Sequence, residues 1–225
     1  MVAMADPLKI TTRSGNVHVR VVAEGELVVV KGTAERLENG TVHIRREPSE
    51  SVIEVQCAPG TDVTVGTLSG KVELEGALGA VRIATVSGKI RVDRVARVDV
   101  RTKSGKVDIR DCAGECRVMT TTSNVHIGRA GRATVAAVSG AVLLEHVDAA
   151  EVKSVSGKVL IATGGRERVS VHTVSGKVEV RVPQSVRPAT RLRSVSGRIN
   201  DECQPGDDCE IAVASISGAI NVSCA

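Results

Sequence analysis

Apolar and polar residues alternate along most of the chain, on both sides of a recurring Ser-Gly dipeptide. Runs such as Val81-Arg82-Ile83 and Val98-Asp99-Val100 lie before the dipeptide, and Lys89-Ile90-Arg91-Val92 follows one of its copies. A period of two is typical of strands that bury one face. No window sustains a period of 3.6, so the pattern predicts short strands and no helix.

The dipeptide marks a repeat of roughly 17–21 residues. A degenerate copy lies at Thr122-Ser123-Asn124-Val125 and a distant one at Arg13-Ser14-Gly15-Asn16-Val17. Each glycine is predicted to form a corner between two strands, because positive φ is unpenalised only for glycine. We expect these corners to be structural and to bind no ligand; they are Gly70, Gly88, Gly105, Gly140, Gly157, Gly176, Gly197 and Gly218.

The repeat length predicts an all-β fold, a single-stranded parallel β-solenoid with roughly 17–21 residues per coil. Stacked coils lie ~4.8 Å apart and bury one another's apolar faces. The alternative is an antiparallel sandwich with turns every ~8–12 residues. Sandwich strands are not expected to repeat one corner at a near-constant spacing, so we favour the solenoid.

The first part of the chain is less regular. Strands are expected at residues 8–12, 17–22, 27–30, 42–45 and 52–57, with turn signals that include Ala23-Glu24-Gly25, Glu38-Asn39-Gly40 and Glu47-Pro48-Ser49. Residues 1–60 are therefore either an irregular β cap or degenerate first coils, and residues 61–225 form the solenoid repeats. Residues 183–188 interrupt the later coils and are expected to form a loop outside the wall.

The position before each Ser-Gly corner forms a column, which we call the pre-corner column. Arg13 and Lys103 occupy it, and burying an unpaired charge is costly. Strand alternation also directs this position outward, which would make an exposed assembly surface. The alternative is a bulge that turns the aliphatic residues inward. The predicted assembly surface comprises Val86, Val138, Val155, Val174, Val195 and Ile216, together with Ile220 and Val222 from the last strand.

Basic residues follow the corner glycines and form a second column, the post-glycine column. One interpretation is that these charges prevent aggregation by blocking strand pairing. The other is a basic surface for an anionic polymer or lipid. The column comprises Lys71, Lys89, Lys106, Lys158, Lys177 and Arg198.

The six cysteines do not have the spacing of paired zinc knuckles. Cys112, Cys116, Cys209 and Cys224 fall on inward positions, so we expect reduced core thiols. In an oxidising compartment, the pair expected to form a disulfide is Cys203–Cys209.

Composition narrows the function classes. The 225 residues include no Phe, Tyr or Trp, which excludes aromatic sugar platforms, base-stacking grooves and aromatic cages. The net charge is +4, and the basic and acidic residues are interspersed along the chain, so no sequence-specific nucleic-acid binding is expected. The five histidines are scattered and no groove of clustered carboxylates is apparent, so we predict no enzyme activity, no cofactor and no metal.

Residues 1–10 lack the pattern of a secretory leader, and no run of ~18–20 apolar residues occurs. The sequence therefore predicts a cytoplasmic protein without a membrane span.

The repeat also carries a family resemblance. The segments Thr85-Val86-Ser87-Gly88-Lys89-Ile90-Arg91-Val92 and Thr173-Val174-Ser175-Gly176-Lys177-Val178-Glu179-Val180 resemble the bacterial β-strand-repeat family labelled "putative adhesin", a domain of unknown function. The resemblance covers residues 60–225, and the early strands resemble that family's less regular N-terminal part. It implies a β-solenoid and no established catalytic residues.

We therefore expect a non-enzymatic structural or interaction protein, a β-solenoid that self-associates or scaffolds partners. The alternative is an adhesive or ligand-binding module that holds an anionic polymer or envelope surface through the post-glycine column. Residues 219–224 predict a last strand with nothing after it to cover the coil. We expect a homodimer closed through this C-terminal coil rather than a filament, because the irregular N-terminal segment would block further stacking.

Overall fold

The computed structural model describes residues 6–22, 27–38, 40–46 and 50–224. These residues form sixteen strands and no helix, so they include no apolar helix long enough to cross a membrane. The strands are β1 (Leu8–Thr12), β2 (Asn16–Val21), β3 (Val28–Lys31), β4 (Thr33–Arg36), β5 (Val42–Arg45), β6 (Val52–Cys57), β7 (Val63–Ser69), β8 (Val72–Ser139), β9 (Val142–Ser156), β10 (Val159–Thr163), β11 (Val169–Ser175), β12 (Val178–Val182), β13 (Pro188–Ser194), β14 (Ile199–Asp201), β15 (Cys209–Ser215) and β16 (Ile220–Cys224).

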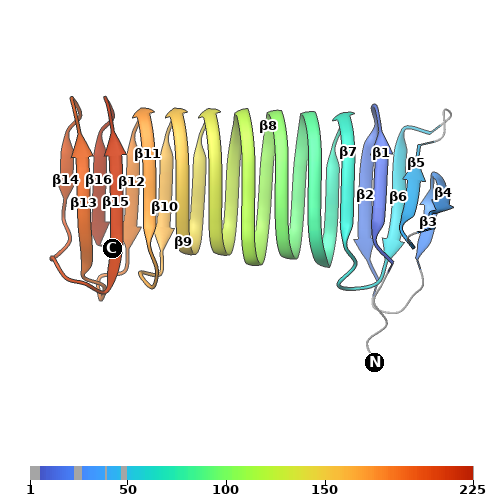
Figure 1. Cartoon of the computed structure of the whole chain (residues 1–225), viewed down its shortest axis with the longest axis horizontal. Coiled ribbons are helices and arrows are strands. Elements are labelled where there is room, and N and C mark those ends of the chain that lie inside the picture. Colours follow the sequence, from blue (N-terminus) through green and yellow to red (C-terminus); the bar gives the residue numbers. More distant parts are fainter. Residues whose placement is uncertain (1–5, 23–26, 39, 47–49, 225) are drawn as a thin grey trace. The chain divides into compact units, whose positions relative to one another are not determined.

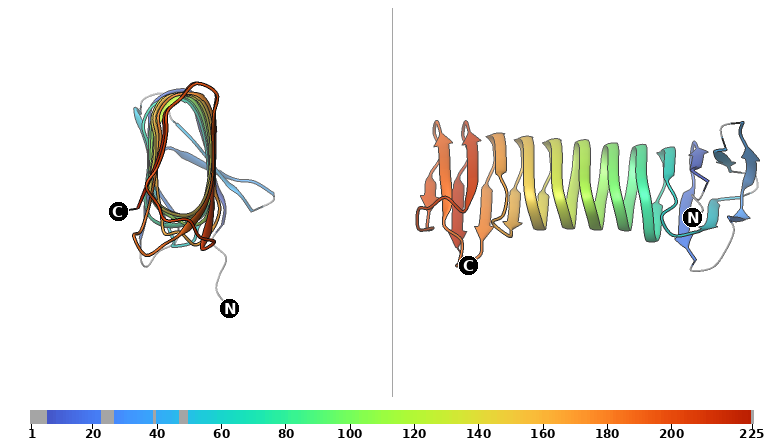
Figure 2. Two further views of the ribbon diagram at one scale, coloured as in Figure 1. Left: turned by 90° about the vertical axis from the view of Figure 1, so that its left-hand side faces the viewer. Right: turned by 60° about the horizontal axis from the view of Figure 1, so that its bottom comes forward.

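The chain divides into two compact units, residues 1–113 (unit 1) and residues 114–225 (unit 2), and β8 continues through the boundary. In each unit the chain winds through successive flattened turns (Figures 1 and 2). In unit 1, Val63 of β7 pairs in parallel with Val81 of β8. In unit 2, Val142 pairs in parallel with Val159, and Val159 with Val178. The prediction of an all-β, mostly parallel, β-solenoid-like fold is confirmed.

Alternation along the strands separates the core from the surface. In β15 every second residue from Cys209 onward is buried, and in β6 the buried positions are likewise every second one. Valine, isoleucine and leucine fill most of the inward positions in both units, where their solvent exposure is 0–5%. Small and medium aliphatic side chains stack well on their own kind in a narrow interior, which explains why the chain needs no aromatic residue.

Buried hydroxyls brace the corners from inside. Thr85 donates its hydroxyl hydrogen to the carbonyl oxygen of Ser87 at 3.2 Å, and Thr102 donates to that of Ser104 at 3.0 Å. In unit 2, Ser154 donates in the same way to Ser156 at 3.2 Å. These bonds satisfy both the inward hydroxyl and a carbonyl at the bend.

Glycine is required at the corners for two reasons. Gly88 and Gly157 have φ values of +144° and +130°, and a Cβ at either position would lie 1.9 or 2.0 Å from the carbonyl oxygen of the preceding corner. The prediction of positive φ is wrong for Gly197 and Gly218. There the close approach alone excludes a side chain, because a Cβ would lie 1.9–2.0 Å from a neighbouring corner carbonyl. Ser123 occupies the corner of the degenerate copy without positive φ.

Unit 1 begins with its strands out of sequence order. β1 lies between β5 and β7, and β2 lies between β6 and β8, so the first pair of strands is not the outermost. β3 and β4 pair antiparallel with β6 and β5 at the edge. The sequence identified the other early strands but not β4. The turn signals at 23–25, 39 and 47–49 lie outside the described residues, and the domain boundary near residue 60 stays a prediction.

Unit 2 ends with the same kind of rearrangement. β15 lies between β11 and β13, and β16 lies between β12 and β14. The expectation that Ile220 and Val222 form an exposed end is therefore wrong, because β16 pairs on both sides and these side chains are 1% and 0% exposed. Residues 183–187 carry no strand, in agreement with the predicted loop.

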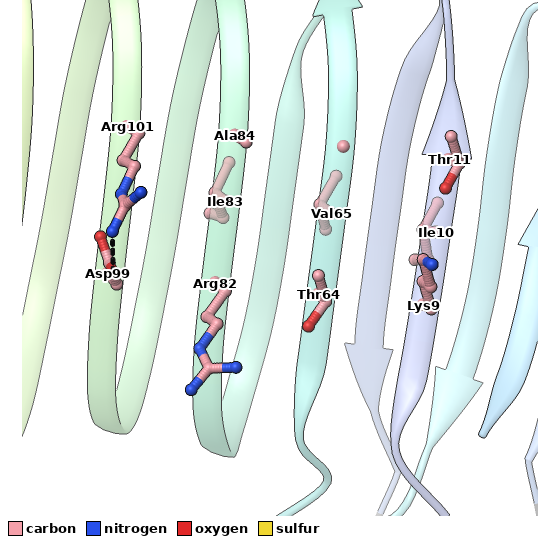
Figure 3. A pocket seen from close by; sticks show the side chains of 11 residues that line it. Lys9, Ile10, Thr11, Thr64, Val65, Arg82, Ile83, Ala84, Asp99 and Arg101 are labelled. Carbon is pink, nitrogen blue, oxygen red and sulfur yellow. Dashed lines mark hydrogen bonds and ion pairs between the residues drawn. The ribbon is translucent and has the colours of Figure 1, made fainter. Parts of the chain in front are cut away.

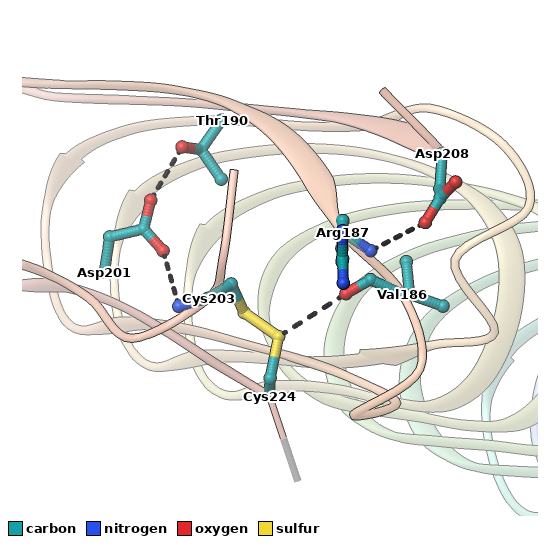
Figure 4. Close-up of a disulfide and its surroundings, with 7 residues drawn as sticks. All are labelled: Val186, Arg187, Thr190, Asp201, Cys203, Asp208 and Cys224. Atoms are coloured by element: carbon teal, nitrogen blue, oxygen red, sulfur yellow. Dashed lines mark hydrogen bonds between the residues drawn. A yellow bond between two sulfur atoms is a disulfide. The ribbon is translucent and has the colours of Figure 1, made fainter. Parts of the chain in front are cut away.

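The edge strands of unit 2, β13 and β14, carry polar side chains at inward positions (Figure 4). Thr190 of β13 donates a hydrogen bond of 2.6 Å to Asp201 of β14, at positions where β15 and β16 carry Ile211 and Val222. Cys203 forms a disulfide with Cys224, so the predicted pairing with Cys209 is wrong, as is the expectation that Cys224 is a reduced core thiol. Cys209 is buried, and Cys112 and Cys116 also lie in inward columns, outside the disulfide.

Candidate interaction surface

The pre-corner column of unit 2 is an exposed apolar surface, which we call the unit 2 column. Its side chains are between 43% and 82% exposed, so the alternative of a bulge that buries them is wrong. In spatial order, the column comprises Val138, Val155, Val174, Ile216 and Val195.

Parallel register builds this surface. Thr173 pairs with Ser154, and Ser175 pairs with Ser156, so Val174 stands beside Val155 on the neighbouring strand. Adjacent strands lie about 4.8 Å apart, which places β-branched side chains in contact along the column. The surface is thus continuous across successive strands.

An open groove of about 420 Å³ runs beside the column. Met119 and Ala136 extend its apolar floor, and Lys153 and His172 border it. Met119 is 45% exposed, and the thioether of methionine adapts its shape to a partner. The sequence interpretation missed Met119 and Ala136. The signal was present, because both stand two residues before the pre-corner column of their own repeat.

Two polar groups that flank the unit 2 column already have partners. Ser156 donates its hydroxyl hydrogen to the carbonyl oxygen of Val138 at 3.4 Å. On the other side, Lys153 forms an ion pair of 2.7 Å with Glu151, and this ammonium group lowers the pKa of Glu151. Around Val138 and Val155, a partner can therefore cover the apolar side chains without stripping water from an unpaired charge at Lys153.

Unit 1 interrupts the same column with charge. Leu68 and Val86 are 55% and 45% exposed, but Arg13 and Lys103 occupy neighbouring positions of the column and are exposed too. Among the described members of this column, an apolar surface that extends over more than two strands therefore occurs in unit 2.

The post-glycine column is partly neutralised. Lys71 pairs with Glu73 at 2.7 Å in unit 1, and in unit 2 Lys177 lies 3.5 Å from Glu179. Lys158 lies 4.0 Å from the same carboxylate, and Arg198 and the remaining members, Lys89 and Lys106, are exposed. This pairing weakens the column as a surface for anions.

Glu179 is held in its charged form. The Arg181 guanidinium donates hydrogen bonds of 3.1 and 2.6 Å to it and thereby lowers the pKa of Glu179, although burial acts in the opposite direction. Elsewhere among residues 6–22, 27–38, 40–46 and 50–224, no three His, Cys, Asp or Glu side chains gather to hold a metal ion.

The fold and this surface define the class of the molecule: an all-β repeat protein with mostly parallel strands and an exposed apolar column. The chain belongs to the Toastrack DUF4097 family, whose model matches residues 2–208. The resemblance inferred from the repeat is thus confirmed.

Two solved structures are similar to this chain. A "putative adhesin" from Parabacteroides distasonis is 10% identical, with a TM-score of 0.56 over 99% of this chain and 94% of that chain. A second "putative adhesin", from Bacteroides fragilis, is 12% identical, with a TM-score of 0.48 over the same shares of the two chains. No curated protein matches the chain.

Proposed function

We propose that the protein is a non-enzymatic interaction protein, a single-stranded β-solenoid with one repeat per coil, which associates through the unit 2 column. The observation that carries this proposal is the unbroken row of exposed aliphatic side chains from Val138 to Val195. Contiguous exposed apolar surfaces mark interaction sites in soluble proteins. The structural neighbour from Parabacteroides distasonis is named a "putative adhesin", which agrees with an interaction role.

The proposed partner is a second copy of the chain. A row of similar aliphatic side chains is complementary to itself, as an interface with two-fold symmetry requires. Val174 is the middle member of the column, so a two-fold axis through it would place Val174 opposite its own copy and Val155 opposite Ile216.

The edge of unit 2 supports lateral association over end-to-end association. Its inward positions are polar at Thr190 and Asp201. Arg191 and Arg193 are exposed on β13, and Arg198 is exposed just before β14. Polar interiors and charged edge strands oppose further strand pairing. The sequence led us to expect a dimer through the C-terminal coil. We propose instead a dimer through the unit 2 column.

The compartment also remains a proposal. The sequence leads us to propose the cytoplasm, whereas the Cys203–Cys224 disulfide is of a kind that persists in oxidising compartments. Fractionation of the native host cell, followed by thiol labelling of the protein, distinguishes the two.

Chemical cross-linking tests the proposed interface. Packed sheets lie ~10 Å apart, within reach of a short bis-maleimide. Val174→Cys is expected to yield covalent dimers that survive denaturation. Val86→Cys, the matched position in unit 1, and the unsubstituted protein are expected to give no covalent dimer, although both associate. Val155→Cys combined with Ile216→Cys should also cross-link. Failure of Val174→Cys to exceed Val86→Cys would exclude this interface.

A further inference from the structure

The outer face of unit 1, on the strands that precede the corners, contains an open groove of about 480 Å³ (Figure 3). We call it the basic groove. It is lined by Lys9 of β1, Thr64 and Gly66 of β7, and Arg82, Asp99 and Arg101 on successive turns of β8.

Strand register explains why the surface is hollow there. Thr11, Gly66 and Ala84 occupy one outward row across neighbouring strands. Gly66 has no side chain and Ala84 has only a methyl group, whereas Lys9 and Arg82 stand in the adjacent row. Long basic side chains thus border a floor of small residues.

The basic groove carries an excess of positive charge. Lys9 and Arg82 form no ion pair with the described part of the chain, and the one carboxylate, Asp99, lies 3.4 Å from Arg101 through its Oδ2 atom. Further exposed cations, Arg13, Arg45 and Lys103, lie on the same face of neighbouring strands. Guanidinium groups bind sulfate, phosphate and carboxylate groups with paired hydrogen bonds.

A second feature indicates what else the ligand carries. The Oδ1 atom of Asp99 is buried, and no donor within the described residues bonds to it. A buried acceptor without a donor is destabilising, so a ligand gains free energy if it displaces the side chains that cover this atom and donates a hydroxyl hydrogen to it. The groove therefore offers cations for acidic groups and an acceptor for hydroxyl groups.

We propose that the basic groove of unit 1 binds an acidic polysaccharide. Its acidic groups contact Lys9, Arg82 and Arg101, and a sugar hydroxyl donates to Asp99. A single-stranded nucleic acid fits less well, because its bases are normally held by aromatic stacking, and the chain has no Phe, Tyr or Trp. The groove is open and its cations continue beyond it, as suits an extended polymer.

Calorimetric titration with polygalacturonate, which carries both carboxylates and hydroxyls, tests the proposal. Neutral dextran and a single-stranded oligothymidylate are the comparison ligands. Arg82→Gln combined with Arg101→Gln is expected to weaken polygalacturonate binding about tenfold or more, since two charge-assisted contacts are lost. The matched control, Arg91→Gln with Arg110→Gln, removes the same charge from the post-corner face of unit 1 and is expected to weaken binding less than about twofold.

For the Asp99→Ala variant, the two explanations of binding predict opposite changes in affinity. The substitution removes a negative charge, so attraction by net charge alone predicts tighter binding of polygalacturonate. If Asp99 accepts a hydrogen bond from a sugar hydroxyl, the variant should instead bind polygalacturonate about threefold or more weakly. Melting temperatures of all variants verify that they fold.

Three outcomes would overturn the proposal: no binding of polygalacturonate, equal losses in the two double variants, or tighter binding by Asp99→Ala. Tighter binding of oligothymidylate than of polygalacturonate would assign the groove to nucleic acid instead. The unit 2 column contributes no residue to this groove. If polygalacturonate does not bind, the proposed self-association therefore still stands, and a monomeric protein would leave the proposed polysaccharide site standing.

Discussion

Units 1 and 2 are built from the same repeat but present different surfaces. In both, buried aliphatic side chains alternate with outward residues, and glycine corners stack carbonyl against Cα. On the strands that precede the corners, unit 1 has a basic groove around Arg82 and Arg101, whereas unit 2 has an apolar column around Val155 and Val174. The repeat therefore specifies the core and the bends, while the outward positions vary independently and determine what each unit binds.

Corner glycines should be equally critical in both units, and their replacement has the largest expected effect. Gly88→Val in unit 1 and Gly157→Val in unit 2 each force a side chain into positive φ and onto a carbonyl oxygen at 1.9 or 2.0 Å. We expect each to lower the free energy of unfolding by about 3 kcal/mol or more. Urea unfolding measures this, and a change confined to one unit would show that the corners differ.

The disulfide should matter in unit 2 alone. Cys203→Ser removes a link across 21 residues, and we expect a loss of about 3 kcal/mol in the free energy of unfolding under oxidising conditions. Adding a reductant to the unsubstituted protein should have the same effect and should leave Cys203→Ser unchanged. A variant that remains as stable as the parent would show that β13 and β14 are held by strand pairing alone.

Acid should weaken both units slightly, through different carboxylates. Hydrogen bonding to Arg181 lowers the pKa of Glu179 in unit 2; in unit 1 burial raises the pKa of Glu75, but bonds from Arg20 and His18 outweigh it and lower it overall. A lowered folded-state pKa contributes stability above the unfolded value of ~4.5, which is lost as pH falls through the folded pKa.

Glu179→Gln should therefore reduce stability at neutral pH by up to ~1 kcal/mol and flatten the loss below pH ~4.5. Glu75→Gln is the counterpart for unit 1. Chemical unfolding at several pH values measures both, and a parallel acid loss in parent and variants would exclude these carboxylates as the cause.

Much of the fold could be predicted because the strand period and the corner spacing are local properties. β1, β5 and β6 begin and end where alternation placed them. The order of strands at the two ends was not predicted, because repeats of similar sequence can pair in more than one order.

In unit 2, the polarity of the inward residues indicates the order of the last strands. β15 and β16 direct Ile211 and Val222 inward and lie inside, whereas β13 and β14 direct Thr190 and Asp201 inward and lie at the edge. Hydrophobic burial favours this order, since a polar pair at the edge keeps contact with water. The correct disulfide follows from it, because β14 and β16 become neighbours.

Of the two candidate surfaces, the sequence predicted the unit 2 column but not the basic groove. Alternation and the charges of Arg13 and Lys103 correctly favoured an exposed pre-corner column. The basic groove was missed because its cations belong to different repeats and come together only through parallel register with Gly66 between them.

Sedimentation equilibrium of two matched variants tests the central claim most directly. Val155→Lys and Val86→Lys place the same charge at the same repeat position in units 2 and 1, and both sites are exposed, so each variant should fold. At about 100 µM the parent should have about twice the 23.4 kDa chain mass. We predict that Val86→Lys retains that mass and Val155→Lys falls to the single-chain mass. A monomeric parent, or equal behaviour of the two variants, would contradict the assignment of the unit 2 column as the association surface.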